Sequence, residues 1–562
     1  MTHHFVVFLL LLLSLLYFKL NLRLHNWGNA KVKQPPARPN LFSGPQDVRK
    51  PSYNTVTVPT ERRIPNILIL LFVIVIGVVT YHLVLKAEQF YELNAKSSSS
   101  RRKSKSKSVK IDGNKEGKAE VVTEKRSILS FNHLTEGEMK GRKIGKLFVS
   151  SNEIAKGSNG TVVLEGVYEG RKVAVKRLVR AHHDVALKEI NNLIASDRHS
   201  NIVRWYGVEH DDDFVYLSLE RCNCSLFDLI KIHESCRTDA QVAKAMADYK
   251  LSLDLIDGLW KPDGRPSPIM LKLLRDVVSG LVHLHELGII HRDLKPNNVL
   301  IVQEKSLCAK LSDMGISRRL DGDMTSLGHH ATGSGSSGWQ APEQILDKRQ
   351  TRAVDMFSLG CVLFFCITCG KHPFGERPHE RDFRVTKNNV DIRLVENIPE
   401  AVDLITRLLN PNSDDRPTAS EVLHHPLFWD AETRTSFLKE ASDRVNLEYR
   451  VVNSVILKSL ETTAPIVLGG RWDKKFDCAI INNLVSHRRY NYRKVGDLLR
   501  AVRNIVNHHK ELPNSIQGLL GTLPEGVDDY FASRFPKFLM EVYKVMYSNC
   551  KEEEWFRKYL KT

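Results

Sequence analysis

No cysteine precedes position 222, and all nine cysteines of the chain lie there or beyond it. The sequence therefore lacks the paired framework of a small secreted domain, and the bulk of the chain is predicted to work in a reducing compartment. Cys366 and Cys369 have the spacing of a metal-binding pair, but they lie in an apolar helical pattern without a second pair. We interpret both as core residues rather than zinc ligands.

Acidic residues are in short supply. Asp and Glu number 65 against 82 Lys and Arg, which gives a formal net charge of +17 and a pI near 9.3. This excess favours an anionic partner, such as nucleic acid, lipid headgroups or nucleotide. Charge alone fits equally well a basic surface that binds nothing in particular. The length of 562 residues allows roughly two to four domains.

Positive charge is missing ahead of the first apolar run, residues 5–18, which has the length of a signal-peptide core. Residues 1–30 are therefore predicted to be either a signal peptide or an uncleaved signal anchor, and the sequence does not decide between the two. A short luminal segment over 31–63 would follow. It is too short for a folded sensor domain without disulfides.

Charged residues are also missing from 67 to 85, a stretch rich in Ile, Leu and Val. Its length and its basic flanks predict a transmembrane helix over 64–86. A basic, Ser- and Lys-rich linker over 87–143 comes next. Because positive charge favours the cytosolic side, the remainder of the chain is predicted to be cytosolic, with membrane lipid as a partner of the linker.

The rest of the chain is organised around residues 291–298, HRDLKPNN, the pattern of a protein-kinase catalytic loop. Asp293 is placed to orient the attacking hydroxyl and accept its proton, and Lys295 to neutralise charge on the transferring phosphoryl group. Asn298 and Asp313 are the predicted Mg²⁺ ligands. These motifs predict a bilobal kinase within an α+β fold.

A glycine-rich loop, a strand lysine and a hinge complete the predicted nucleotide site. Lys176 would hold the phosphates of ATP or ADP, and Glu189 on the following helix would pair with it. The loop has alanine where its first glycine is usual, so it is a weak signal by itself. The residues predicted to line this site are Ala155, Gly157, Gly160, Val162, Ala174, Lys176, Glu189, Glu220 and Cys222.

Residues 317–337 have the composition of an activation loop, with many hydroxyls among glycines and basic residues. Phosphate pairing with arginine can order such a loop. Beyond it, Glu343 is predicted to pair with Arg416, and Asp355 to brace the catalytic loop from a buried core helix. We read no role for the insertion at 233–268. The candidate phosphorylation sites are Thr325, Ser326, Thr332 and Ser334.

The kinase pattern spans 144–429, and a helical pattern rich in Arg, Lys, His and Tyr follows. By periodicity, Leu498 and His509 share an apolar stripe, while Arg500 and Arg503 fall on another. This pattern by itself would make His509 a core residue and the arginines a solvated face.

Several separate motifs of this tail resemble the kinase-extension nuclease domain. That domain is shared by ribonuclease L and by the inositol-requiring kinase/endoribonuclease of the unfolded protein response. The transmembrane helix ahead of the kinase selects the latter family. The resemblance spans about 146–547 and implies an all-α nuclease domain over 430–562. Its motifs are SFLKEASDR at 436–444, DLLRAVRN at 497–504, HH at 508–509, ELP at 511–513 and YFASRFP at 530–536.

The resemblance implies a nuclease chemistry that needs no cofactor. By it, Tyr490 helps to deprotonate the ribose 2′-hydroxyl and His509 protonates the leaving 5′-oxygen. Arg503 stabilises charge on the phosphate, and Asn504 holds the site in shape. A histidine suits the acid role because its pKa lies near working pH. The products would be a 2′,3′-cyclic phosphate and a 5′-hydroxyl.

The resemblance also implies a location in the endoplasmic-reticulum membrane and stem-loop mRNA as substrate, for unconventional splicing and mRNA decay. Nucleotide binding and autophosphorylation would drive a homodimer or higher oligomer that activates cleavage. We expect this protein to lack a luminal sensor domain, and therefore to be activated through the membrane segment or by joining full-length relatives. Two other classes stay open: a membrane-anchored receptor kinase with a non-catalytic helical tail, and a pseudokinase scaffold.

Overall fold

The structure is a computed structural model that describes residues 140–157, 161–179, 183–196, 199–235, 258–319 and 335–561. The predicted signal segment, luminal segment, transmembrane helix and most of the linker lie outside these residues. Among the described residues, no helix is both long and apolar enough to cross a membrane. Strand β1 (Gly141–Ile144) begins inside the predicted linker, so the folded part starts a few residues before the predicted boundary at 144.

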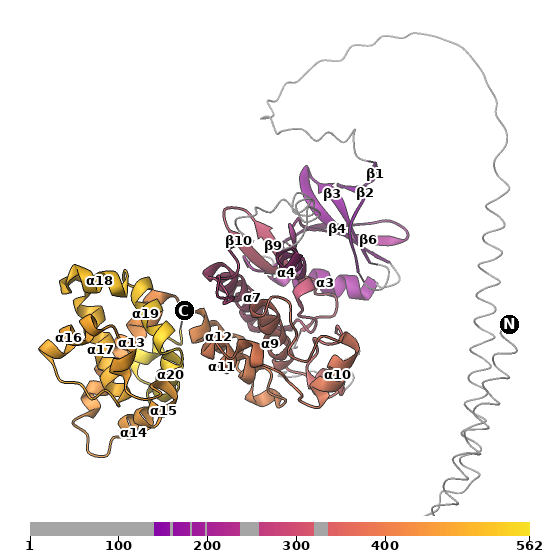
Figure 1. Ribbon diagram of the computed structural model, residues 1–562. Helices are drawn as coiled ribbons and strands as arrows, with labels where there is room; N and C mark the ends of the chain where they lie inside the picture. The colour runs from indigo at the N-terminus through magenta and orange to yellow at the C-terminus, as the bar shows by residue number, and fades with distance from the viewer. Residues whose placement is uncertain are drawn as a thin grey trace, which may run out of the picture. The chain divides into compact units, whose positions relative to one another are not determined.

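The first lobe is an antiparallel sheet in the order β1-β2-β3-β4-β6-β5 (Figure 1). Successive side chains of a strand point to opposite faces of the sheet, so Val173 and Val175 of β4 both point into the core that contains Leu147 and Tyr216. Helix α3 (His183–Ser196) follows β4. The other strands are β2 (Leu147–Lys156), β3 (Val162–Tyr168), β4 (Arg171–Val179), β5 (Trp205–His210) and β6 (Phe214–Glu220).

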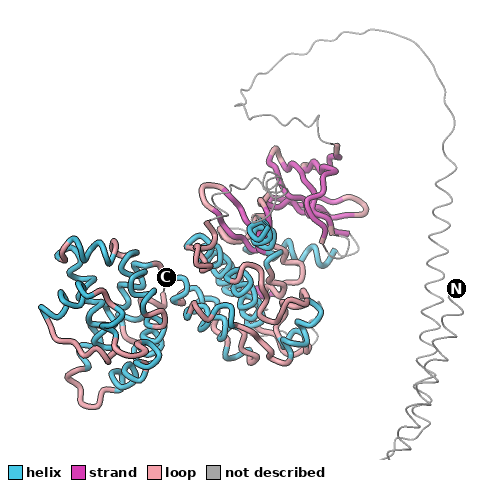
Figure 2. The backbone as a smooth tube through the Cα atoms, viewed as in Figure 1, coloured by secondary structure: helices cyan, strands magenta, loops and turns pink. Residues whose placement is uncertain are grey.

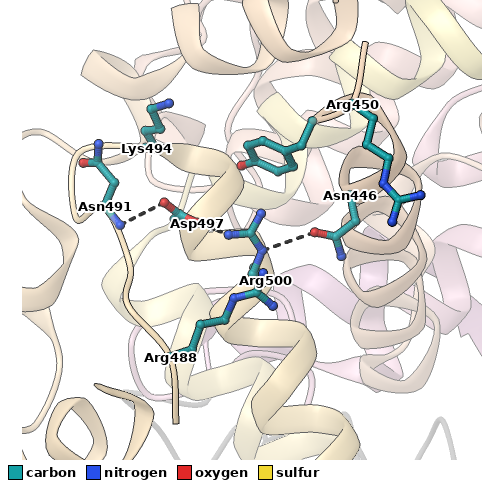
Figure 3. Close-up of a pocket in the computed structure, with 8 residues that line it drawn as sticks. Asn446, Arg450, Arg488, Asn491, Lys494, Asp497 and Arg500 are labelled. Carbon is teal, nitrogen blue, oxygen red and sulfur yellow. Dashed lines mark hydrogen bonds and ion pairs between the residues drawn. The ribbon is translucent and has the colours of Figure 1, made fainter. Parts of the chain in front are cut away.

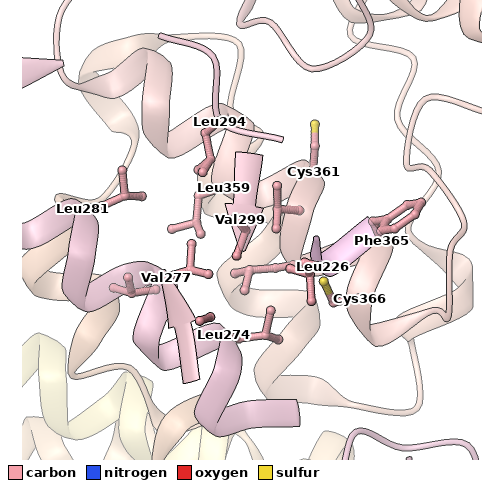
Figure 4. Close-up of a cluster of buried hydrophobic side chains, with 14 of the residues drawn as sticks. Leu226, Leu274, Val277, Leu281, Leu294, Val299, Leu359, Cys361, Phe365 and Cys366 are labelled. Carbon is pink, nitrogen blue, oxygen red and sulfur yellow. The ribbon is translucent and has the colours of Figure 1, made fainter. Parts of the chain in front are cut away.

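The second lobe is mainly helical and packs around α9 (Ala353–Ile367), whose residues from Val354 onward are all buried. Figure 4 shows part of this core, where Leu274, Val277 and Leu281 of α7 meet Leu359 of α9. The prediction of a buried core helix is therefore confirmed. The surrounding elements are α4 (Leu226–Ser235), α7 (Pro268–Glu286), α10 (Pro378–Thr386), α11 (Pro399–Leu408), α12 (Ala419–Leu423), and the hairpin of β9 (Val299–Gln303) and β10 (Leu307–Leu311).

Cys366 lies in this core with no exposed surface, as predicted, and Cys369 is half-buried beside the ring of His233, with 3.4 Å between Sγ and Nδ1. The pair predicted between Glu343 and Arg416 is also present. The two guanidinium nitrogens of Arg416 donate to the two carboxylate oxygens of Glu343 at 2.6 and 2.9 Å. Most of the insertion at 233–268 lies outside the described residues.

The C-terminal region is helical, as Figure 2 shows, and this confirms the predicted all-α domain. Its core forms where α13 packs against α17, with Phe437 and Val445 on one helix and Leu498 and Val502 on the other. The helices are α13 (Ala431–Glu448), α14 (Val455–Thr462), α15 (Ala464–Val467), α16 (Cys478–His487), α17 (Val495–His508), α18 (Asn514–Leu520), α19 (Glu525–Arg534), α20 (Phe538–Cys550) and α21 (Glu554–Arg557).

A buried histidine of the second lobe makes the fold sensitive to acid. Burial, with a smaller contribution from Arg381, lowers the pKa of His372 to about 3. The unfolded chain binds this proton near pH 6.5 and the folded chain does not, so acidification favours unfolding below that pH. Each pH unit between 6.5 and 3 should cost about 1.4 kcal/mol at this site.

We expect His372→Gln to flatten the acid side of the stability profile. The midpoint of thermal unfolding, followed from pH 6.5 to 5, should fall less steeply in this variant than in the wild type. His379→Gln is the matched control, because the His379 side chain is 78% exposed. Equal slopes for all three proteins would contradict the assignment to His372.

Candidate kinase and nuclease sites

The catalytic loop is held from below by one buried carboxylate. Asp355 of α9 has no exposed surface and accepts the backbone N–H groups of His291 and Arg292, both at 2.8 Å. The ring of His285 approaches the same carboxylate at 2.9 Å. Burial opposes ionisation, yet the hydrogen bonds and the charges of His285 and His291 lower the pKa of Asp355. The predicted brace is therefore present.

Two polar residues of the loop converge on the carboxylate of Asp293. Lys295 Nζ lies 2.9 Å from an Asp293 oxygen, and the amide nitrogen of Asn298 donates to the same oxygen at 2.9 Å. Ser336 adds a contact that the sequence did not predict. Its backbone N–H donates to the other Asp293 oxygen at 2.8 Å, and its hydroxyl contacts Lys295 Nζ. The activation segment thus returns to the catalytic loop at Ser336.

The lysine predicted to hold the nucleotide phosphates lies between two carboxylates. Lys176 Nζ lies 2.7 Å from Glu189 on α3 and 2.7 Å from Asp313. The charge of Lys176 lowers the pKa of Asp313 to about 2, so this carboxylate is ionised at neutral pH. Met314 stands where the metal-binding motif usually has phenylalanine, and its side chain is fully buried. The predicted ion pair is present, with Asp313 beside it.

The other predicted nucleotide residues lie along the sheet. Ala155 of β2 pairs with Val163 of β3, next to the pairing of Lys156 with Val162. The N–H of Gly157 donates to the Thr161 carbonyl at 2.9 Å, which closes the base of the loop. Gly160 and the four candidate phosphorylation sites lie outside the described residues. Ala174 of β4 pairs with Leu219 of β6, one residue before Glu220, and Cys222 follows in the hinge.

Three of the four residues predicted for the nuclease, Tyr490, Arg503 and Asn504, lie around the C-terminal half of α17. The amide nitrogen of Asn504 donates to the phenol oxygen of Tyr490 at 2.8 Å, so the structure joins these two residues. Both Tyr490 and Tyr492 pack their rings on Trp472, at 5.9 and 5.0 Å between centroids. Arg503 pairs with Asp443 of α13. Burial raises the pKa of Tyr490, which keeps its phenol protonated.

His509 does not join this group. It is 7% exposed, and its Nε2–H donates to the carbonyl oxygen of Gly521 at 2.9 Å. The adjacent His508 has a side chain that is 60% exposed, and its Nδ1 lies 2.9 Å from the Glu511 carboxylate. Residues four apart on a helix share a face, so His508 lies on the face of Asn504. That spacing is the signal that could have selected His508 from the sequence.

Two regions of the chain match known domain families. Residues 148–428 match the protein kinase domain family and residues 434–560 match the ribonuclease 2-5A family. The chain is thus a protein kinase joined to a ribonuclease 2-5A domain.

Individual proteins similar to this chain indicate a narrower family than the two domain matches do. The chain is 59% identical over 487 residues to the serine/threonine-protein kinase/endoribonuclease IRE1a of Arabidopsis thaliana, covering 84% of this chain and 58% of that protein. It is 55% identical over 458 residues to IRE1b of the same plant, covering 80% of this chain and 52% of the relative. A third Arabidopsis relative, named an inactive IRE1-like kinase/endoribonuclease, is 43% identical over 453 residues, covering 75% of this chain and 80% of that protein.

This chain belongs to the IRE1 family of kinase/endoribonucleases, which confirms the resemblance predicted from the motifs. It spans about half the length of the first two relatives. The missing luminal sensor domain stays a prediction.

Proposed function

We propose that this chain is a serine/threonine kinase and endoribonuclease of the unfolded protein response. It acts on stem-loop mRNA from the endoplasmic-reticulum membrane, with both catalytic domains in the cytosol. The observation that carries the proposal is the contact of Tyr490 with Asn504, with His508 on the same helix face. This group lies in the region that matches ribonuclease 2-5A.

The kinase half is proposed to use ATP with Mg²⁺. Two oxygen donors, the ionised carboxylate of Asp313 and the amide of Asn298, suit a hard cation. Both hydrogen bonds from Asn298 to Asp293 use the amide nitrogen, so a metal would take the amide oxygen. Bound Mg²⁺ would neutralise phosphate charge. Asp293 orients the acceptor hydroxyl and takes its proton, while Lys295 sits beside the transferring group.

The nuclease half is proposed to cut by transesterification. The ribose 2′-oxygen attacks the phosphorus, the bond to the 5′-oxygen breaks, and His508 gives a proton to that oxygen. Tyr490, whose raised pKa keeps the phenol protonated, orients the 2′-hydroxyl. The proton of the 2′-hydroxyl passes to solvent. Arg503 stabilises the charged phosphate once it exchanges Asp443 for the substrate. Glu511 accepts a hydrogen bond from Nδ1–H of His508 at 2.9 Å and so orients the ring.

Regulation is proposed to follow the family. Nucleotide binding and autophosphorylation in the activation segment, at Thr325, Ser326, Thr332 or Ser334, would favour a homodimer or an assembly with full-length relatives. In physical terms the nucleotide shifts a population toward the oligomer that cuts RNA. Membrane lipid would contact the basic linker.

A scaffold without catalysis is the second candidate, because one relative carries the word inactive in its name. The chain's own residues count against it. Lys176 is paired with Glu189, and Asp293 is held by its loop partners. A pseudokinase has no need to keep this set intact.

The test uses the full chain in detergent, a short stem-loop RNA and ADP, with EDTA present. We expect fragments that end in a 2′,3′-cyclic phosphate and a 5′-hydroxyl, and a rate at least about 100-fold lower for Asn504→Leu. A parallel incubation with ATP and Mg²⁺ should label the activation segment in the wild type and leave Asp293→Asn unlabelled. Intact RNA beside a labelled kinase would support the receptor kinase with a non-catalytic tail.

A further inference from the structure

A basic pocket opens beside the nuclease residues, between the end of α13, the start of α17 and the loop that carries Tyr490 (Figure 3). Its volume is about 510 Å³. Four of its lining side chains are cationic and one is a carboxylate. The lining residues are Asn446, Tyr449, Arg450, Arg488, Asn491, Lys494, Asp497 and Arg500.

The base of this pocket is a fixed guanidinium. Arg500 is 8% exposed, and it pairs with Asp497 and donates to the side-chain oxygen of Asn446 at 3.2 Å. Its charge also lies over the ring of Tyr449, 4.6 Å from the centroid. A second oxygen of Asp497 accepts the backbone N–H of Asn491 at 2.8 Å, which ties the loop to the helix. A cation held this way loses little side-chain freedom when it binds an anion.

The rim adds exposed positive charge to this fixed base. Arg450, Arg488 and Lys494 are exposed, and none of the three forms an ion pair with a residue that the structure describes. Asp497 is the sole carboxylate in the lining, and Arg500 already occupies it. The pocket therefore carries a surplus of positive charge that a phosphate group would neutralise. Arginine forks and a lysine are the side chains that bind phosphate best.

The pocket is continuous with the nuclease residues. Asn491 lines it and also lines a second hollow that contains Tyr490. Along α17, Arg500, Asn504 and His508 follow one another at intervals of four residues. With a rise of 1.5 Å per residue, the pocket and His508 lie about 6 Å from Asn504 in opposite directions along the helix axis. A strand that reaches His508 at one end passes the pocket at the other.

We propose that this basic pocket binds a backbone phosphate of the RNA strand on the 5′ side of the cut. The inference rests on the proposed function. His508 meets the leaving 5′-oxygen, which belongs to the nucleotide on the 3′ side, so the opposite end of α17 faces the strand that precedes the cut. Phosphate contacts of this kind position the strand without reading its sequence.

An anionic membrane surface is the competing occupant. Val451 and Val452, 52% and 89% exposed, follow Arg450 and could enter a bilayer interface. RNA is favoured because the loop that forms one wall of the pocket also carries Tyr490. Membrane binding is therefore an outcome of the test rather than a second proposal.

The first experiment measures affinity, separated from cleavage. The full chain binds a stem-loop RNA with a 2′-deoxy nucleotide at the cut, and the dissociation constant is followed against salt concentration. The variant carries Arg450→Gln and Lys494→Gln, two exposed rim residues. We expect affinity at least about tenfold lower and a salt slope smaller by about 1.4, or 0.7 for each lost charge on a single strand. Lys537→Gln, an exposed cation at the start of α20, should bind like the wild type.

The second experiment locates the phosphate. Single neutral methylphosphonate linkages are placed at each position of the same RNA. The wild type should lose affinity for one linkage on the 5′ side of the cut, and the double variant should be insensitive to that linkage. Sensitivity confined to the 3′ side would overturn the inference. The inference would also be overturned if the double variant kept its affinity for RNA but no longer bound vesicles containing phosphatidylserine.

Failure of the two proposals can be told apart. If the wild type binds the deoxy RNA through the pocket but leaves unmodified RNA intact, the nuclease assignment fails and the phosphate site stands. If it cuts RNA and the double variant binds normally, the nuclease assignment stands and the pocket has no role in RNA binding.

Discussion

His508→Phe should lower the rate of RNA cleavage by at least about 100-fold and leave the melting temperature unchanged. The change removes the only ring nitrogen donor that the structure places on the face of Asn504 among the described residues of α17 and its following turn. Because the His508 side chain is 60% exposed, phenylalanine can be accommodated there without repacking. Cleavage is measured by separating labelled RNA fragments with ADP present.

The same substitution at the adjacent position should give the opposite result. His509→Phe keeps an aromatic ring, larger than the imidazole, but leaves the Gly521 carbonyl without its donor, at a cost of about 1–3 kcal/mol. Thermal unfolding should therefore shift to lower temperature, while cleavage below that transition stays within a few-fold of the wild type. If His509→Phe is inactive and folded, and His508→Phe is active, the acid is His509 after all.

The proposed choice of His508 instead of His509 depends on structural information that the sequence motifs do not contain. Periodicity put His509 on the apolar stripe of α17, and the structure buries it there. The resemblance assigned the general acid to His509, but a match to a His-His motif does not determine which of the two histidines donates the proton. The helical spacing from Asn504 separates the two. Motif matching alone does not show which face of a helix a residue occupies.

The kinase half was more predictable, because its motifs fix partners that are far apart in sequence. The contacts of Lys176 with Glu189 and of Asp355 with the catalytic loop were expected and are present. Arg500 was not predictable in the same way. Its stripe indicated a solvated face, but the guanidinium is buried by Asp497 and Tyr449. Asp497 lies three residues earlier on the same helix, but Asn446 and Tyr449 come from the end of α13, and periodicity within α17 does not show those two partners.

Arg434→Met should destabilise the protein by about 3–5 kcal/mol, because one arginine joins the two catalytic regions. Arg434 of α13 donates to Glu400 of α11 at 2.8 Å, and its other face pairs with Asp528 of α19 at 3.1 Å. Its side chain is 19% exposed. Burial raises the pKa of Asp528 even though Arg434 lies beside it and lowers that pKa. Urea unfolding measures the loss.

An exposed pair provides the control. Arg393 pairs with Asp391 at 2.6 Å, but its side chain is 80% exposed and solvent screens the pair, so Arg393→Met should unfold at nearly the same urea concentration as the wild type. Adding Glu400→Gln and Asp528→Asn to Arg434→Met should recover much of the lost stability, because no buried charge is then unpaired. A loss that persists in the triple variant would mean that Arg434 acts through packing. Since Arg434 bridges kinase and nuclease helices, the single variant should also weaken the stimulation of cleavage by ADP.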